Sequence, residues 1–141
     1  MKLSRSVDVD RPVSAVWKWY AIDHVVNHPR WDPAMQLRQE GEGPIGVGTR
    51  IRRRHTRVDT PIEGTMEVVE FEPERSMGVV IRDGTPHGVL EVRGRAALEP
   101  LDAERTRLTF ELELPGEAPS MDPSMIEASL RRIKQLIEDE T

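Results

Sequence analysis

One long amphipathic helix that follows seven strand-like segments is the feature that most limits what this chain can fold into. Between residues 122 and 139, apolar residues recur at three- and four-residue spacing, with Pro123 in the first turn and Asp122 or Ser120 as the candidate cap. The apolar stripe consists of Ile126, Leu130, Ile133 and Ile137. A helix of this kind must bury its stripe, and the concave face of a curved sheet would accept it.

The seven strand-like segments alternate apolar and polar residues, which is typical of strands with one buried face. They cover residues 2–9, 35–40, 47–58, 61–72, 76–82, 87–98 and 105–114. Short turns at 82–85 and 100–103 predict antiparallel hairpins. In segment 61–72 the apolar positions shift by one residue after Val68, which a β-bulge or sharp bend would produce. We therefore expect an α+β fold with a seven-stranded, curved antiparallel sheet.

Two short helices are expected between the first two strands. Asp10 is the candidate cap of the first helix, and Pro12 suits its first turn. Its apolar stripe would consist of Val13, Val16, Trp17 and Tyr20. Asp23 could cap the second helix, which we expect to end at Asn27 because Pro29 follows shortly afterwards.

The length of 141 residues predicts a single domain over residues 1–141. With 37% apolar and 32% charged residues, the composition is that of a globular chain rather than a disordered or membrane-spanning one. No apolar run is long enough to insert into a membrane, and the opening MKLSRSVDVD alternates as a strand does rather than as a signal peptide does. The chain contains no cysteine, which excludes disulfides, thiolate nucleophiles and cysteine-based zinc sites and fits a cytoplasmic location. The net charge of -5 argues against nucleic acid as a partner.

Several short motifs follow one another in a recognisable order. They are HPRWDP (28–33), the glycine-rich GEGPIGVGTR (41–50), EFEPE (70–74) and TRLTF (106–110), and the terminal helix comes after them. In this order and spacing the whole chain resembles the polyketide cyclase/dehydrase-like branch of the SRPBCC (START/birch-allergen) superfamily. The resemblance implies a helix-grip fold with an internal cavity for apolar or aromatic ligands. It does not imply one activity, because the superfamily includes carriers, ligand sensors, chaperone activators and a minority of enzymes.

The segment VGTRIRRRHTRV carries the candidate catalytic residues. If Ile51 points inward, the alternation of a strand turns Arg53 and His55 inward too. Desolvation would lower the pKa of His55 and leave a neutral base or hydrogen-bond acceptor. Arg53 could polarise a substrate carbonyl or bind a carboxylate. In family members that act as aromatic cyclases, an inward arginine from this region has a similar role, and Arg53 is the matching residue.

The same segment also has a purely structural interpretation. Its even-numbered arginines could form an exposed charge ladder with glutamates of the neighbouring strand, which are Glu63, Glu67, Glu70 and Glu72.

Other residues are candidates for ligand contact in such a cavity: Trp31, Ile51, Met66, Leu90, Val92, Phe110, Met125 and Ser129. Trp31 is either a lid of the cavity or a packing anchor, and its position in the family favours the anchor. Tyr20, the chain's only tyrosine, is a doubtful counterpart of the tyrosine that accompanies the arginine in cyclases. His24 and His28 have a spacing that can bind metal, but with Pro29 next to them and no third ligand we expect no metal site and no cofactor. His87 is expected to be exposed in a loop.

The sequence therefore predicts a protein that binds a small hydrophobic or aromatic molecule in an internal cavity, with polyketide cyclase/dehydratase-like catalysis as one option. The alternatives are a non-catalytic carrier or sensor of hydrophobic ligands and a module that binds another protein on its sheet surface. The sequence leaves open whether the protein is a monomer or a homodimer.

Overall fold

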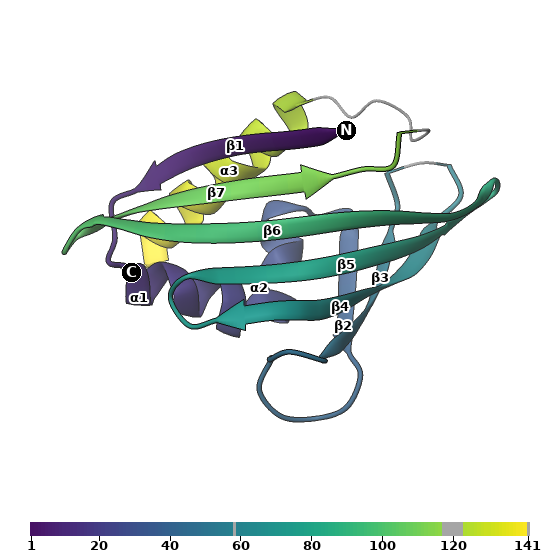
Figure 1. Cartoon of the computed structure of the whole chain (residues 1–141), viewed down its shortest axis with the longest axis horizontal. Helices are drawn as coiled ribbons and strands as arrows, with labels where there is room; N and C mark the ends of the chain where they lie inside the picture. Colours follow the sequence, from purple (N-terminus) through teal and green to yellow (C-terminus); the bar gives the residue numbers. More distant parts are fainter. Residues whose placement is uncertain (58, 117–122, 141) are drawn as a thin grey trace.

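The computed structural model describes residues 1–57, 59–116 and 123–140 (Figure 1). Along the chain its elements are β1 (Lys2–Val9), α1 (Val13–Trp17), the π-helical turn η1 (Lys18–Ile22), α2 (His24–Trp31), β2 (Met35–Gln39), β3 (Arg50–His55), β4 (Ile62–Glu72), β5 (Ser76–Thr85), β6 (Gly88–Asp102), β7 (Arg105–Glu113) and α3 (Pro123–Glu140). The strands form one seven-stranded antiparallel sheet in the order β1-β7-β6-β5-β4-β3-β2. The predicted fold class is confirmed.

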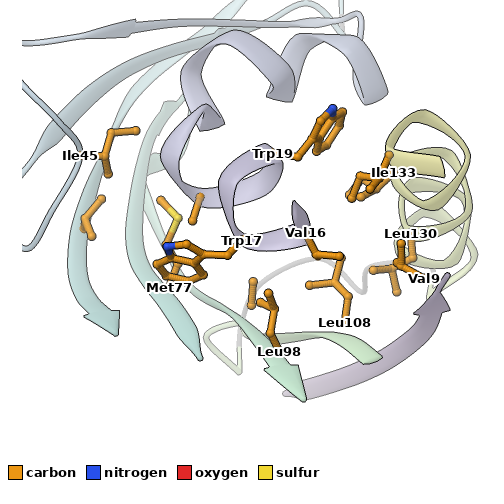
Figure 2. Close-up of a cluster of buried hydrophobic side chains, with 14 of the residues drawn as sticks. Val9, Val16, Trp17, Trp19, Ile45, Met77, Leu98, Leu108, Leu130 and Ile133 are labelled. Atoms are coloured by element: carbon orange, nitrogen blue, oxygen red, sulfur yellow. The ribbon is translucent and has the colours of Figure 1, made fainter. Parts of the chain in front are cut away.

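Helix α3 lies along the sheet as its apolar stripe predicts, and Figure 1 shows it behind β1 and β7. All four stripe residues are buried, and Ile133 and Ile137 are completely so. They belong to one core cluster with Val9 of β1, Leu108 of β7 and Trp19 of η1 (Figure 2). This burial supplies the driving force that holds the helix in the curve of the sheet. The candidate caps Ser120 and Asp122 lie outside the described residues.

The predicted irregularity in β4 is a bulge. The register between β4 and β5 shifts between Val68 and Glu70, which leaves Val69 without a partner and 44% exposed. Because of this extra residue, Val68 before the bulge and Phe71 after it both reach the core. The Phe71 ring lies 4.9 Å from that of Trp17, between ring centroids. The bulge thus lets one strand bend while it keeps its apolar face inward.

The predicted end of the second helix was wrong. Helix α2 continues past Asn27 to Trp31 with Pro29 inside it, and the N–H of Asp32 still donates to the carbonyl of His28 at 3.1 Å. Proline removes one helical hydrogen bond. Here the extra turn brings Trp31 into stacked contact with the rings of Tyr20 and His28, and this ring packing offsets the loss.

The predicted helix caps also need correction. No side chain caps α1, which begins after Pro12, and the Asp10 carboxylate lies near Lys134 of α3 instead, with Oδ2 3.9 Å from Nζ. Asp23 does occupy the position before α2, but its carboxylate accepts from Lys18 Nζ at 2.7 Å rather than from the helix.

Strand boundaries differ from the prediction at three places. Strand β3 is shorter than predicted, whereas the β5–β6 hairpin runs on until Thr85 pairs with Gly88. The β6–β7 hairpin likewise continues until Asp102 pairs with Arg105. The expected turns at 82–85 and 100–103 were therefore placed too early. The first of these errors matters because Asp83 belongs to a strand and not to a turn.

The exposed face of β3 carries the predicted charge ladder in part. Arg50 and Arg54 lie 3.8 Å and 3.9 Å from Glu67 and Glu63 on β4. Arg52 instead pairs with Glu40, and Glu70 pairs with Arg95 of β6 across Gly78 of β5. Exposed pairs of this kind contribute about 0–1 kcal/mol each, so their main effect is to keep this face charged.

Candidate functional site

A cavity with a volume of about 340 Å³ lies between the concave face of the sheet, helix α2 and the first turns of α3. Small-molecule sites usually measure about 300–1,000 Å³, so a compact ligand would fit. Most of the wall is apolar and comes from the inward faces of β4 to β7, including Met66, Met77, Ile81, Val92, Phe110 and Leu112.

Strand β3 contributes the polar end of this cavity. Its alternation buries Ile51, Arg53 and His55, and leaves the arginines between them exposed. Arg53 and His55 are each 9% exposed, and Asp83 of β5 is 8% exposed. Arg53 Nε lies 3.1 Å from Asp83 Oδ1, and His55 Nε2 lies 3.8 Å from Asp83 Oδ2. Three charged or titratable groups therefore share one buried corner.

Gly64 makes the contact between Arg53 and Asp83 possible. It lies on β4, between β3 and β5, and pairs with Arg53 of β3 on one side and with Asp83 of β5 on the other. A Cβ atom at this position would stand 2.2 Å from Asp83 Oδ1. The missing side chain thus leaves the space through which the carboxylate reaches the guanidinium.

The buried corner is incompletely hydrogen-bonded. Within the described part of the chain, Arg53 Nε, His55 Nδ1 and Asp83 Oδ1 have no hydrogen-bond partner, since the Arg53–Asp83 contact is close but poorly directed. Buried polar atoms without partners are unfavourable and call for an explanation, and all three belong to residues of the cavity wall.

Burial and neighbouring charges set the protonation states at this end of the cavity. Burial lowers the pKa of His55, the positive charge of Arg57 lowers it further, and Asp83 opposes both effects. The direction is the one predicted from the sequence. Burial also lowers the pKa of Arg53, against the attraction of Asp83. His55 is therefore neutral near pH 7, while Arg53 keeps its charge.

Helix α2 and η1 form a second polar edge. His24 Nδ1 lies 2.9 Å from the carbonyl oxygen of Tyr20, and His28 Nδ1 lies 3.1 Å from His24 Nε2. The His28 and Trp31 rings stack with centroids 4.5 Å apart and planes 10° apart. Burial lowers the pKa of His24 to about 4, and burial together with His24 and Arg53 lowers the pKa of His28.

Most of the predicted site residues lie at this cavity. Its wall includes both candidate catalytic residues, Arg53 and His55, and seven of the candidate contact residues: Trp31, Met66, Leu90, Val92, Phe110, Met125 and Ser129. Ile51 does not line it, because this side chain is completely buried in the core cluster. Met125 is 52% exposed, as expected of a residue at the rim.

The wall also contains residues that the sequence analysis did not assign to the site, among them the polar residues Tyr20, His24, His28 and Asp83. Asp83 was assigned to a turn, and the second histidine to the end of a helix. The spacing of Tyr20, His24 and His28 at every fourth residue was the available signal, since it places all three on one helical face.

Among the described residues, no group of three or more His, Asp or Glu side chains is placed to hold a metal ion. His87 is exposed, as predicted.

Comparison with protein families matches residues 1–138 to the family described as polyketide cyclase/dehydrase and lipid transport. The chain belongs to this family. The match agrees with the resemblance seen in the sequence motifs and places the chain in the SRPBCC superfamily. A search of curated proteins gave no match.

Solved structures share the fold of this family member at low sequence identity. Ara h 8.0201 is 16% identical with a TM-score of 0.74, and the match covers 99% of each chain. A protein from Arthrobacter aurescens is 18% identical with a TM-score of 0.75, over 99% of this chain and 87% of that one. Norcoclaurine synthase from Thalictrum flavum, solved with dopamine and hydroxybenzaldehyde, is 15% identical with a TM-score of 0.71, over 100% of this chain and 88% of that one.

None of the helices in the described ranges is long and apolar enough to cross a membrane.

Proposed function

We propose that this protein binds a small, mostly apolar or aromatic molecule in the cavity between the sheet and α3. The observation that carries this proposal is the combination of an apolar wall with one buried polar corner whose atoms lack partners. A solid core would bury neither Arg53 nor Asp83 in this way, because unsatisfied buried charge destabilises a fold. A ligand that brings its own polar atom would satisfy the corner.

The polar corner favours an oxygen atom on the ligand. Arg53 Nε is a donor without a partner in the described chain, so it suits a carbonyl or carboxylate oxygen. The aromatic rings of Phe110, Trp31 and Tyr20 line the same space and suit a flat ligand. The complex of norcoclaurine synthase with two aromatic molecules supports this, because it shows the same fold holding such compounds.

A blocking substitution tests the binding proposal. Leu90→Trp would fill part of the cavity, because Leu90 lines it, whereas Val89→Trp is the matched control on the 71%-exposed neighbouring position. A fluorescent apolar probe should bind to the wild type and to Val89→Trp, and at least tenfold more weakly to Leu90→Trp. Equal binding to both variants would place the probe outside the cavity and contradict the proposal.

A second candidate function is cyclase/dehydratase-like catalysis, which the unpartnered atoms of Arg53 and His55 favour. In a dehydration, neutral His55 would take the proton from the carbon beside a carbonyl that Arg53 polarises. The electron pair would form a carbon–carbon double bond, and the β-hydroxyl would leave as water after accepting the proton from His55.

A simple β-hydroxy ketone, 4-hydroxy-4-phenylbutan-2-one, tests the enzymatic option, because its dehydration product absorbs in the near ultraviolet. Catalysis by Arg53 and His55 should accelerate the reaction, with a loss of roughly 100-fold in Arg53→Gln. The exposed-face variant Arg52→Gln should retain the activity. No acceleration by the wild type would leave the carrier or sensor role as the one that fits.

We also propose that residues 1–141 form a single domain and that the protein is cytoplasmic and has no nucleic-acid partner. The lack of cysteine supports the location, and the net charge of -5 argues against nucleic acid.

A further inference from the structure

Helix α2 and η1 hold two histidines in a hydrogen-bonded chain that starts at a backbone carbonyl. The carbonyl oxygen of Tyr20 can only accept, so His24 Nδ1, 2.9 Å away, must carry a proton and donate it. The His24 side chain is buried and neutral, which leaves its Nε2 without a proton. Nε2 of His24 is therefore an acceptor.

The proton on the second ring, that of His28, is also placed by its partner. His28 Nδ1 lies 3.1 Å from His24 Nε2, and since the latter accepts, His28 Nδ1 must donate. Conversion of His28 to the charged form is opposed by its burial and by the charges of Arg53 and Arg57. His28 is thus neutral with its proton on Nδ1, and its Nε2 carries an unshared electron pair.

His28 Nε2 has no hydrogen-bond partner in the described part of the chain, and His28 belongs to the cavity wall. Stacking on Trp31 and the bond to His24 hold the ring in one orientation. The other polar groups of this wall include Arg53, Arg57 and Arg95, which only donate, and groups that can accept, among them Asp32, Asp83, Glu111 and neutral His55. His28 therefore adds a fixed, uncharged acceptor to a cavity whose cations are donors.

We propose, resting on the ligand-binding function proposed above, that His28 Nε2 accepts a hydrogen bond from a hydroxyl group of the ligand and so selects phenol-type or enol-type molecules. An anionic oxygen at this position would face the electron pair of Nε2 and be repelled. An ether would place a methyl group there and leave the acceptor unsatisfied. The selected ligand is therefore an aromatic or enolic compound with a free, un-ionised hydroxyl at this position.

Two probes that differ only in this donor test the inference. 2-Naphthol carries a neutral hydroxyl at pH 7, and 2-methoxynaphthalene has the same rings with the hydroxyl methylated. Wild-type protein should bind 2-naphthol about three- to tenfold more tightly than the ether, the range expected for one hydrogen bond. His28→Phe keeps an aromatic ring against Trp31 but removes the acceptor, so the two probes should bind equally.

Further variants separate a selective role from a structural one. His28→Gln, whose amide oxygen can accept, should regain part of the preference for 2-naphthol. His87→Phe, an exposed position outside the cavity, should keep the full preference. If His28→Phe does not fold, the ¹⁵N chemical shifts of the wild-type rings provide the second measurement. They should show Nε2 of both histidines unprotonated at pH 7.

The outcomes are distinguishable from those of the underlying proposal. If neither probe binds, the ligand-binding function fails and the role of His28 fails with it. If both probes bind the wild type equally, or if Nε2 of His28 carries the proton, ligand binding stands and the inference about His28 is overturned.

Discussion

Arg53 and Asp83 meet across a strand to which neither belongs, with Arg53 Nε 3.1 Å from Asp83 Oδ1 above Gly64. Strands β3 and β5 both neighbour β4, so their side chains are two strand spacings apart and ordinarily would not touch. The glycine between them removes the side chain that would keep them apart. The polar corner of the cavity therefore depends on three residues that pair in register, one from each of β3, β4 and β5.

Gly64→Ala should disrupt this corner directly. The added Cβ would stand 2.2 Å from Asp83 Oδ1 and 2.3 Å from the carbonyl oxygen of Arg82, so backbone must shift. We expect a loss of about 1–3 kcal/mol in the free energy of unfolding, as for other overpacked positions, together with weaker probe binding. Gly84→Ala is the control, since its nearest atom would lie at an ordinary 3.5 Å. Equal urea midpoints for the two variants would contradict the role assigned to Gly64.

The pH dependence of stability should report the buried His24. Burial lowers the pKa of His24 from 6.5 to about 4 in the folded protein, so the unfolded chain binds this proton more readily. The contribution of His24 to stability is complete above the unfolded pKa and is lost as the pH falls toward 4. The difference between the two pKa values corresponds to a loss of about 3 kcal/mol in the free energy of unfolding. The free energy of unfolding, measured by urea between pH 7 and pH 4, should fall less steeply in His24→Gln than in the wild type. Parallel curves would show that His24 is not buried in its neutral form.

Two residues of α3 should respond differently to truncation. Ile133 is completely buried in the core cluster, whereas Met125 is 52% exposed at the cavity rim. Ile133→Ala should lower the free energy of unfolding by about 2–5 kcal/mol, and Met125→Ala by less than about 1 kcal/mol. Met125→Ala should instead change the affinity for a fluorescent apolar probe. A larger loss of stability in Met125→Ala, with unchanged probe binding, would mean that α3 closes a solid core.

The chain sequence predicted the architecture well because its strands and last helix carry clear periodicities. The apolar stripe of α3 is buried as its spacing predicted, and the phase shift after Val68 corresponds to the bulge in β4. The site was harder to predict, because it depends on contacts between strands that are distant in sequence. Asp83 could not be paired with Arg53 without the register of β3, β4 and β5.

Local rules also failed where tertiary packing outweighed them. Pro29 ordinarily ends a helix, yet α2 continues because the added turn brings Trp31 into ring contact with Tyr20 and His28. The histidine chain followed from that unexpected turn. The i,i+4 spacing of His24 and His28 indicated one helical face, but a helix that ends at Asn27 would not have placed both rings on it.

Methionine methyl groups offer the most direct test of ligand binding in the cavity. Met35, Met66, Met77 and Met125 line the cavity, whereas Met1 lies outside it and is 47% exposed. In a protein labelled with ¹³C at the methionine methyls, titration with 2-naphthol should shift the signals of Met66 and Met77 in a saturable manner and leave that of Met1 unchanged. If the signals of Met66 and Met77 stay fixed at saturating probe, the cavity does not take up an aromatic ligand, and the account of this protein as a small-molecule binder is wrong.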